Sequence, residues 1–168
     1  MLTLTRSASD AHLTDLVGPR SALARELTEA YWQEIETVSN YATSSTNRGG
    51  INADRTARPV RETLASDLKH AHQVASRIRQ LHATAPGPVD FSARAPRLAP
   101  PADPLDNLAL LTDLIDAETA AIERYRRIAA IASDARDWVT ENLTKQVIGE
   151  KDIHRQSLWS LLTDGSKS

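Results

Sequence analysis

The amino-acid sequence predicts an all-α protein, a single bundle of four helices with a long crossover between the second and the third. Aromatic residues make up only 4% of the 168 residues, while alanine, leucine, arginine and glutamate are abundant, which favours helix over sheet. Apolar residues recur at helical spacing in four long segments. Five of the eight prolines fall within residues 85–103, which have neither a helical nor a strand period. A connection of that length can join parallel neighbours in a bundle.

The first two helices are predicted from their proline starts and from the turn composition between them. Because proline suits the first helical position, the first helix should run from Gly18–Pro19 to about Thr43. Residues 44–57 are rich in serine, threonine, asparagine and glycine, which end a helix. The second helix should then run from Arg58–Pro59 to about Thr84.

The last two helices should be joined by a short turn. The third is predicted to open at Asp103–Pro104, where Asp103 would be a good N-cap. A break at Ser133–Asp134 begins the fourth, which continues to Leu162. The chain is thus expected to comprise an N-terminal arm (1–17), the bundle (18–162) and a polar tail (163–168).

Composition excludes several classes of protein. The net charge is −2, with 20 Lys and Arg against 22 Asp and Glu, so no overall field points to nucleic acid or to anionic lipid. The absence of cysteine excludes disulfides and thiolate metal sites, so any metal must be bound by histidine and carboxylate. No apolar run is long enough to span a membrane, and the first residues lack the apolar core of a signal peptide. A cytoplasmic protein is the expectation.

Ionisable residues interrupt the apolar seam of each predicted helix near its middle. In the first two helices these residues are Glu34 and Asp67, which lie 33 positions apart, and in the last two they are Glu118 and Lys151, which also lie 33 positions apart. A histidine follows three positions after Asp67 and three positions after Lys151, one turn on along the same helix face. This spacing matches di-iron carboxylate bundles, whose oxygen and imidazole ligands suit iron and manganese. A buried network of salt bridges and hydrogen bonds is the alternative reading of the same pattern. The residues are Glu34, Asp67, His70, Glu118, Lys151 and His154.

The surrounding sequence resembles the ferritin-like superfamily, most of all its bacterioferritin and rubrerythrin-type branch, over residues 19–162. Asp67-Leu68-Lys69-His70-Ala71 is similar to the Glu-x-x-His-Ala of the second helix in that family. The other three helices carry similar motifs: Glu34-Ile35-Glu36-Thr37-Val38-Ser39-Asn40-Tyr41, Glu118-x-x-x-Ile122-x-x-Tyr125 and Ile148-x-Glu150-x-x-x-His154-x-x-x-Leu158.

The resemblance implies a ligand set and a range of activities. Glu34, Asp67 and His70 would hold one iron ion, with Asp67 as a bridge, and Glu118 and His154 would hold a second. The activities in the family include the oxidation of ferrous iron with oxygen or peroxide, iron storage and peroxide reduction. The three tyrosines are expected to be core aromatics with hydrogen-bonded hydroxyls.

Departures from the family pattern limit what this chain is expected to bind. Lys151 stands in place of the bridging glutamate of the fourth helix, which predicts at most about one iron or manganese ion per chain. Leu68 replaces the haem-ligating methionine, so no haem is expected. Glu150, four residues before His154, is a further candidate ligand if it turns inward, and otherwise lies in solvent.

Two hypotheses of function remain open. In the first, the chain is an oxidoreductase-like metalloprotein, ferroxidase-like if it is an enzyme. In the second, it is a metal-free structural or interaction protein in which Lys151 replaces the metal by pairing with Glu34, Asp67 and Glu118. A homodimer or a larger homo-oligomer is expected in either case.

Overall fold

The computed structural model describes residues 19–44, 53–87 and 106–165, and these form four helices without a strand. The helices are α2 (Pro19–Ser44), α3 (Ala53–Gln80), α4 (Asn107–Asp134) and α5 (Trp138–Gly165). The predicted all-α four-helix bundle is therefore confirmed. The predicted N-terminal arm, the last three residues of the tail and most of the proline-rich crossover lie outside the described residues.

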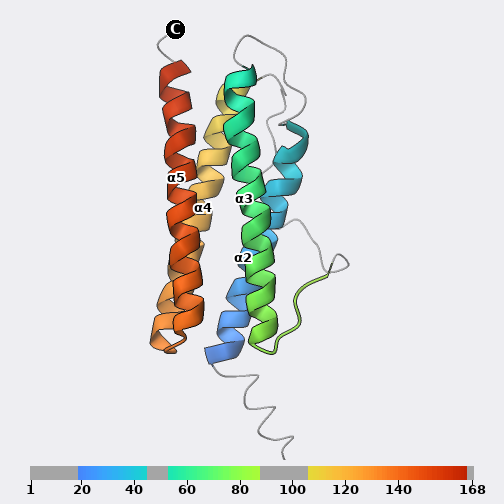
Figure 1. Ribbon diagram of the computed structural model, residues 1–168, viewed down its shortest axis with the longest axis vertical. Coiled ribbons are helices and arrows are strands. Elements are labelled where there is room, and N and C mark those ends of the chain that lie inside the picture. Colours follow the sequence, from blue (N-terminus) through green and yellow to red (C-terminus); the bar gives the residue numbers. More distant parts are fainter. Residues whose placement is uncertain (1–18, 45–52, 88–105, 166–168) are drawn as a thin grey trace, which may run out of the picture.

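The helices run up, down, down and up in chain order (Figure 1). α2 packs mainly on α3 and α4 mainly on α5, and the contacts of α2 with α4 and of α3 with α5 close the bundle. α3 and α4 run in the same direction, so α3 ends and α4 begins at opposite ends of the bundle, which is the arrangement that a long crossover joins (Figure 1).

Two helix starts differ from the sequence prediction. α3 begins at Ala53 instead of Arg58, and Pro59 lies inside it. A proline inside a helix removes one backbone hydrogen bond, but Thr56 and Ala57 are buried, and this packing holds the turn before it in helical form. α4 begins after Asp106 instead of at Asp103, because the Asp106 carboxylate caps the helix by accepting the N–H of Ala109 at 2.9 Å.

Two helix ends also differ. α3 ends at Gln80 rather than Thr84, because His82 adopts a left-handed conformation with φ 62°. The N–H of Ala83 then donates to the carbonyl of Ile78 at 3.1 Å, which is the closing bond of a Schellman motif. α5 continues to Gly165, beyond the predicted end at Leu162.

The turn between α4 and α5 falls at residues 135–137, just after the predicted break. Asp137 caps α5 by accepting the Thr140 N–H at 3.1 Å and the Thr140 hydroxyl at 2.7 Å. From α3, the guanidinium of Arg77 donates to both Asp137 oxygens at 2.7 and 2.8 Å. These contacts fix α5 against α3 at this end of the bundle.

The core consists of two apolar clusters with a polar layer between them. Each cluster takes residues from all four helices, since the apolar stripe of every helix faces the bundle axis. One includes Leu27, Val74, Ile128 and Val147, and the other includes Tyr41, Leu64, Leu114 and Leu158. The layer between them holds the candidate functional residues.

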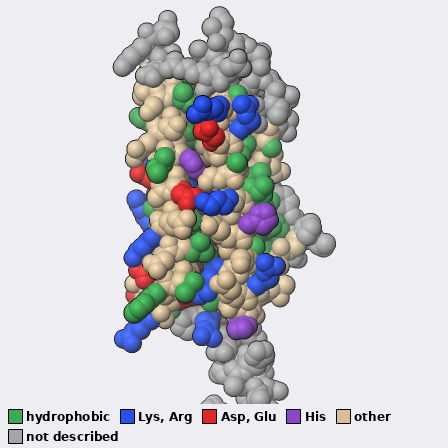
Figure 2. Space-filling view, in the orientation of Figure 1, with side chains coloured by type: hydrophobic (Ala, Val, Ile, Leu, Met, Phe, Trp, Pro, Cys, Tyr) green, Lys and Arg blue, Asp and Glu red, His purple; other side chains and the backbone are tan. Residues whose placement is uncertain are grey.

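Basic and acidic side chains both occur on the face of the bundle seen in Figure 2, so the charges on this face are not of a single sign. Among the described helices, none combines the length and the apolar character needed to cross a membrane.

Candidate functional site

The polar layer centres on the side chain of Lys151, which α5 projects into the bundle and which is 1% exposed. Its Nζ lies 2.7 Å from Asp67 Oδ1, 2.9 Å from Glu34 Oε2 and 3.3 Å from Glu118 Oε1. The three carboxylates come from three different helices and are all buried. The structure therefore brings together the four mid-helix residues that the sequence singled out. We call them the Lys151 cluster.

Glu34 is held at both of its oxygens. Oε2 contacts Lys151, and Oε1 accepts a hydrogen bond of 2.9 Å from the buried hydroxyl of Tyr125 on α4. The expectation of a hydrogen-bonded core tyrosine is met here. It is not met at Tyr41, whose buried hydroxyl has no partner among the described residues.

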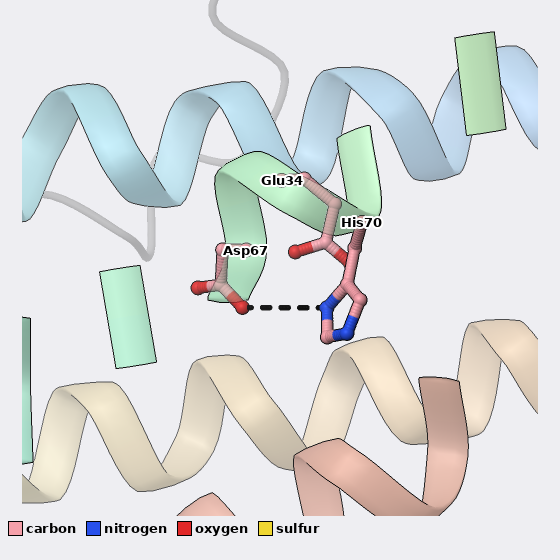
Figure 3. A group of neighbouring side chains, drawn as sticks. All are labelled: Glu34, Asp67 and His70. Atoms are coloured by element: carbon pink, nitrogen blue, oxygen red, sulfur yellow. Dashed lines mark ion pairs between the residues drawn. The ribbon is translucent and has the colours of Figure 1, made fainter. Parts of the chain in front are cut away.

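His70 lies beside the cluster, one turn after Asp67 on α3, and its side chain is completely buried. Figure 3 shows the imidazole facing Asp67, with Glu34 reaching toward both from α2. His70 Nδ1 is 3.9 Å from Asp67 Oδ1, too far for a hydrogen bond. Ligand atoms of Glu34, Asp67 and His70 all lie within 4.8 Å of one another, and within the described ranges no other group of three or more such residues does so.

Glu150 contacts the other nitrogen of His70, from the outer side of the ring. Its Oε2 lies 3.0 Å from His70 Nε2 and 2.9 Å from the ammonium of Lys69. Hydrogen bonds from Gln146 and Lys69 lower the pKa of Glu150 to about 2, so it is ionised. Since a carboxylate can only accept, His70 Nε2 carries the proton and Nδ1 presents a lone pair to the cluster. Glu150 does not turn inward as a ligand in this structure.

The other half of the predicted ligand set is less closely assembled. Glu118 reaches Lys151 through one oxygen, and its second oxygen, Oε2, is buried without a hydrogen-bond partner in the part of the chain described. His154 is half-buried, and its Nδ1 is also without a partner there. The structure thus places Glu118 in the cluster and His154 outside its direct contacts.

The charges of the cluster do not balance by themselves. Burial alone would lower the pKa of the Lys151 ammonium, but the three carboxylates around it outweigh burial and hold that pKa well above its ordinary value. Burial raises the pKa of Glu34 and of Glu118 to about 8 in each case, against the opposing charge of Lys151. One ammonium cannot neutralise three carboxylates, so the charge of Lys151 does not cancel the effect of burial on the pKa values of Glu34 and Glu118.

Both histidines near the cluster favour the neutral form. Burial is the main cause that lowers the pKa of His70, and the positive charge of Lys151 adds to it. Burial likewise lowers the pKa of His154. Neutral imidazole is the form that binds a metal ion.

The sequence matches the ferritin-like domain family over residues 24–168. The chain belongs to the ferritin-like domain family. No curated protein sequence matches the chain.

Solved structures support the same fold. A bacterioferritin-related protein from Bacteroides fragilis, described as a dodecameric thioferritin, is similar with a TM-score of 0.80 and 25% identity over 88% of each chain. A ferritin-like diiron-carboxylate protein from Bacillus anthracis has a TM-score of 0.75 and 18% identity, over 86% of this chain and 97% of that one. The bacterioferritin of Desulfovibrio desulfuricans has a TM-score of 0.69 and 17% identity, over 86% and 80% of the two chains.

The buried atoms of this ferritin-like chain fit one metal ion on the His70 side of the cluster. His70 Nδ1 and Asp67 Oδ2 are buried ligand atoms that find no partner among the residues described. Buried polar atoms are nearly always satisfied, so two such atoms on one turn of one helix need an explanation. Carboxylate and imidazole are the donor set that iron and manganese take in proteins.

The role of Glu150 and the contacts of Lys69 are not visible in the sequence. The spacing of residues along α5 identifies Glu150 only as a further candidate ligand. A contact across two helices at the edge of the core leaves no periodic signal in the sequence, because Lys69 and Glu150 occupy positions typical of solvated residues.

Proposed function

We propose that this ferritin-like protein binds one divalent transition-metal ion per chain, iron or manganese, through Glu34, Asp67 and His70. The main observation in support of this proposal is the orientation of the His70 imidazole. Its outer nitrogen donates to Glu150 while the buried lone pair of Nδ1 faces the Asp67 carboxylate without a partner. A lone pair beside a carboxylate is unfavourable unless a cation lies between them, and an outer carboxylate on the other nitrogen is the usual arrangement for a metal-binding histidine.

The residues around the proposed site have separate tasks. Glu34 and Asp67 supply negative charge, and His70 supplies a neutral donor held in the required tautomer by Glu150. Tyr125 fixes the orientation of Glu34 through its hydrogen bond. The apolar clusters on both sides exclude water from the site. A bound ferrous ion would supply an electron to oxygen or peroxide, so we propose iron oxidation as the reaction.

Assembly into a homo-oligomer belongs to the same proposal. The related Bacteroides fragilis protein is described as a dodecamer, and it matches this chain over 88% of both lengths. Native mass spectrometry or light scattering after size exclusion would test the proposal, and a monomer at micromolar concentration would contradict it.

A metal-free role is the second candidate, and the position of Lys151 favours it. The ammonium contacts all three buried carboxylates within 3.3 Å, so it already provides a counter-charge where a ferritin-like site would hold metal. In this case the bundle would be a structural or interaction protein, and its outer faces would make the assembly.

Metal loading distinguishes the two candidates. Protein stripped with a chelator is loaded anaerobically with ferrous iron, desalted and analysed for metal, together with His70→Ala and the control His72→Ala. His72 is an exposed histidine of the same helix. We expect about one iron per chain in wild type and in the control, and loss of that iron in His70→Ala.

The remaining outcomes each decide against part of the proposal. Wild type without iron or manganese would support the metal-free role. Iron retained in His70→Ala would show that the proposed ligand set is wrong. Oxygen consumption after addition of ferrous iron then tests the reaction, since a chain that binds iron without consuming oxygen or peroxide is not a ferroxidase.

A further inference from the structure

Lys151 lies where it touches both halves of the predicted ligand set. Its Nζ contacts Asp67 and Glu34 on the His70 side and Glu118 on the other side. The side chain is buried and therefore cannot move its charge into solvent without leaving the core. Any ion that enters the cluster shares the three carboxylates with this ammonium.

The formal charges set the number of ions that the cluster can take. The three carboxylates carry −3 and the ammonium +1, so one divalent ion brings the sum to zero. A second divalent ion would leave an excess of +2 in a buried, weakly polar environment. Such an excess is strongly unfavourable, because buried charges must be paired and the charge of a bound ion dominates its site.

Buried ligand atoms without a partner among the described residues also lie on the Glu118 side of the cluster. Glu118 Oε2 and His154 Nδ1 are both buried and have no hydrogen-bond partner within the described helices. They are of the right chemical type to bind an ion, but the contact of Lys151 with Glu118 competes with one.

We propose that the ammonium of Lys151 takes the place of one metal ion, so that the chain holds one ion fewer than a site with a carboxylate at this position would. The proposal rests on the proposed function for the ion on the His70 side. According to this proposal, a residue that is not itself a ligand sets the number of ions that the cluster binds. Its direct consequence is that Lys151→Glu gains an ion.

The test compares two identical substitutions on the same helix. Lys151→Glu changes the buried lysine, and Lys145→Glu changes an exposed one whose side chain is 61% accessible and pairs with Glu141. Both variants and wild type are stripped, loaded anaerobically with ferrous iron and analysed for metal. We expect two irons per chain in Lys151→Glu and one in wild type and Lys145→Glu. Loading with Mn²⁺ should give the electron paramagnetic resonance signal of isolated ions in wild type and of a coupled pair in Lys151→Glu.

The outcomes separate this inference from the proposed function. An equal ion count in Lys151→Glu and wild type would overturn the inference, as would two ions in wild type. If wild type binds none and Lys151→Glu binds at least one, the proposed function fails, but the inference that lysine replaces an ion stands.

A second variant covers the case in which Lys151→Glu does not fold without metal. Lys151→Met keeps a similar side-chain length and removes the charge. We expect it to melt at a lower temperature than wild type in chelator and to gain more from added Mn²⁺ than wild type does, since the ion then supplies the positive charge that the ammonium supplies in wild type. Identical melting temperatures in chelator, with no larger gain from Mn²⁺, would overturn the inference.

Discussion

Two buried tyrosines provide a matched test of the hydrogen bond that holds Glu34. Tyr125 is 1% exposed and donates to Glu34 Oε1 at 2.9 Å, whereas Tyr41 is 0% exposed and its hydroxyl has no partner among the described residues. Tyr125→Phe removes a hydrogen bond to a carboxyl group and leaves that oxygen unsatisfied, which should cost about 1.5–3 kcal/mol of unfolding free energy. Tyr41→Phe removes an unpaired buried hydroxyl and should leave stability unchanged within about 0.5 kcal/mol or increase it.

Urea denaturation followed by circular dichroism, in buffer with a chelator, measures both variants against wild type. The difference between the two midpoints carries the information, because each variant loses one hydroxyl from a fully buried ring and the apolar change is the same. A loss of the same size in both variants would refute the reasoning, since the cost would then not come from the bond to Glu34. A loss below about 0.5 kcal/mol in Tyr125→Phe would show that the bond contributes little.

Three further predictions concern the edge of the cluster, the end of the bundle and the pH dependence. Glu150→Gln should weaken metal binding about 10–100-fold with little change in ion count, because the carboxylate that fixes the tautomer and orientation of His70 is then missing. Competition with a chelating dye measures this affinity. Arg77→Ala should cost about 2–3 kcal/mol in urea denaturation, since it leaves the mostly buried Asp137 without the guanidinium nitrogen that contacts both of its oxygens. Burial raises the pKa of Asp137, but hydrogen bonds from Arg77 and Thr140 outweigh burial, so the pKa is lowered on folding. The stabilisation from the Arg77–Asp137 contact should therefore be present above pH 3.8 and be lost in wild type as the pH falls below that value. Metal-free protein should lose stability between pH 7 and pH 8, on the order of 1–2 kcal/mol, because the pKa values of Glu34 and Glu118 are raised to about 8 in the folded chain, so that unfolding releases their protons. Below pH 7 the lowered pKa values of His70 and His154 oppose this effect, since the unfolded chain then binds protons at both imidazoles. Equal urea midpoints at the two pH values would contradict this last expectation.

The fold was predictable because one pattern repeats in every helix. Apolar residues at helical spacing identify four helices, and a proline-rich stretch between the second and third identifies the crossover. The helix limits were less predictable. Pro59 reads as a helix start, yet the burial of Thr56 and Ala57 extends α3 before it, and tertiary packing of this kind overrides local propensity.

The members of the cluster were predictable for the same reason, and their contacts were not. Glu34, Asp67, Glu118 and Lys151 interrupt apolar seams at one level, so a bundle must bring them together. The orientation of each side chain depends on neighbours from other helices. Glu150 contacts His70 and Lys69. This orientation depends on those two side chains of the neighbouring helix α3 and not on the spacing of residues along α5.

The buried lysine also changes how metal binding relates to folding. Where buried carboxylates have no internal counter-charge, folding depends more strongly on the ion, and some such proteins unfold when the metal is removed. In this chain Lys151 contacts all three carboxylates, and Glu34 and Glu118 retain protons near neutral pH, so the metal-free cluster is close to neutral. An arriving divalent ion replaces those two protons, which keeps the sum of charges constant. We therefore expect the metal-free bundle to remain folded, and ion binding to release about two protons per ion below pH 8. Titration calorimetry in buffers of different ionisation enthalpy measures that number, and binding without proton release would show that the three carboxylates are already ionised in the metal-free chain.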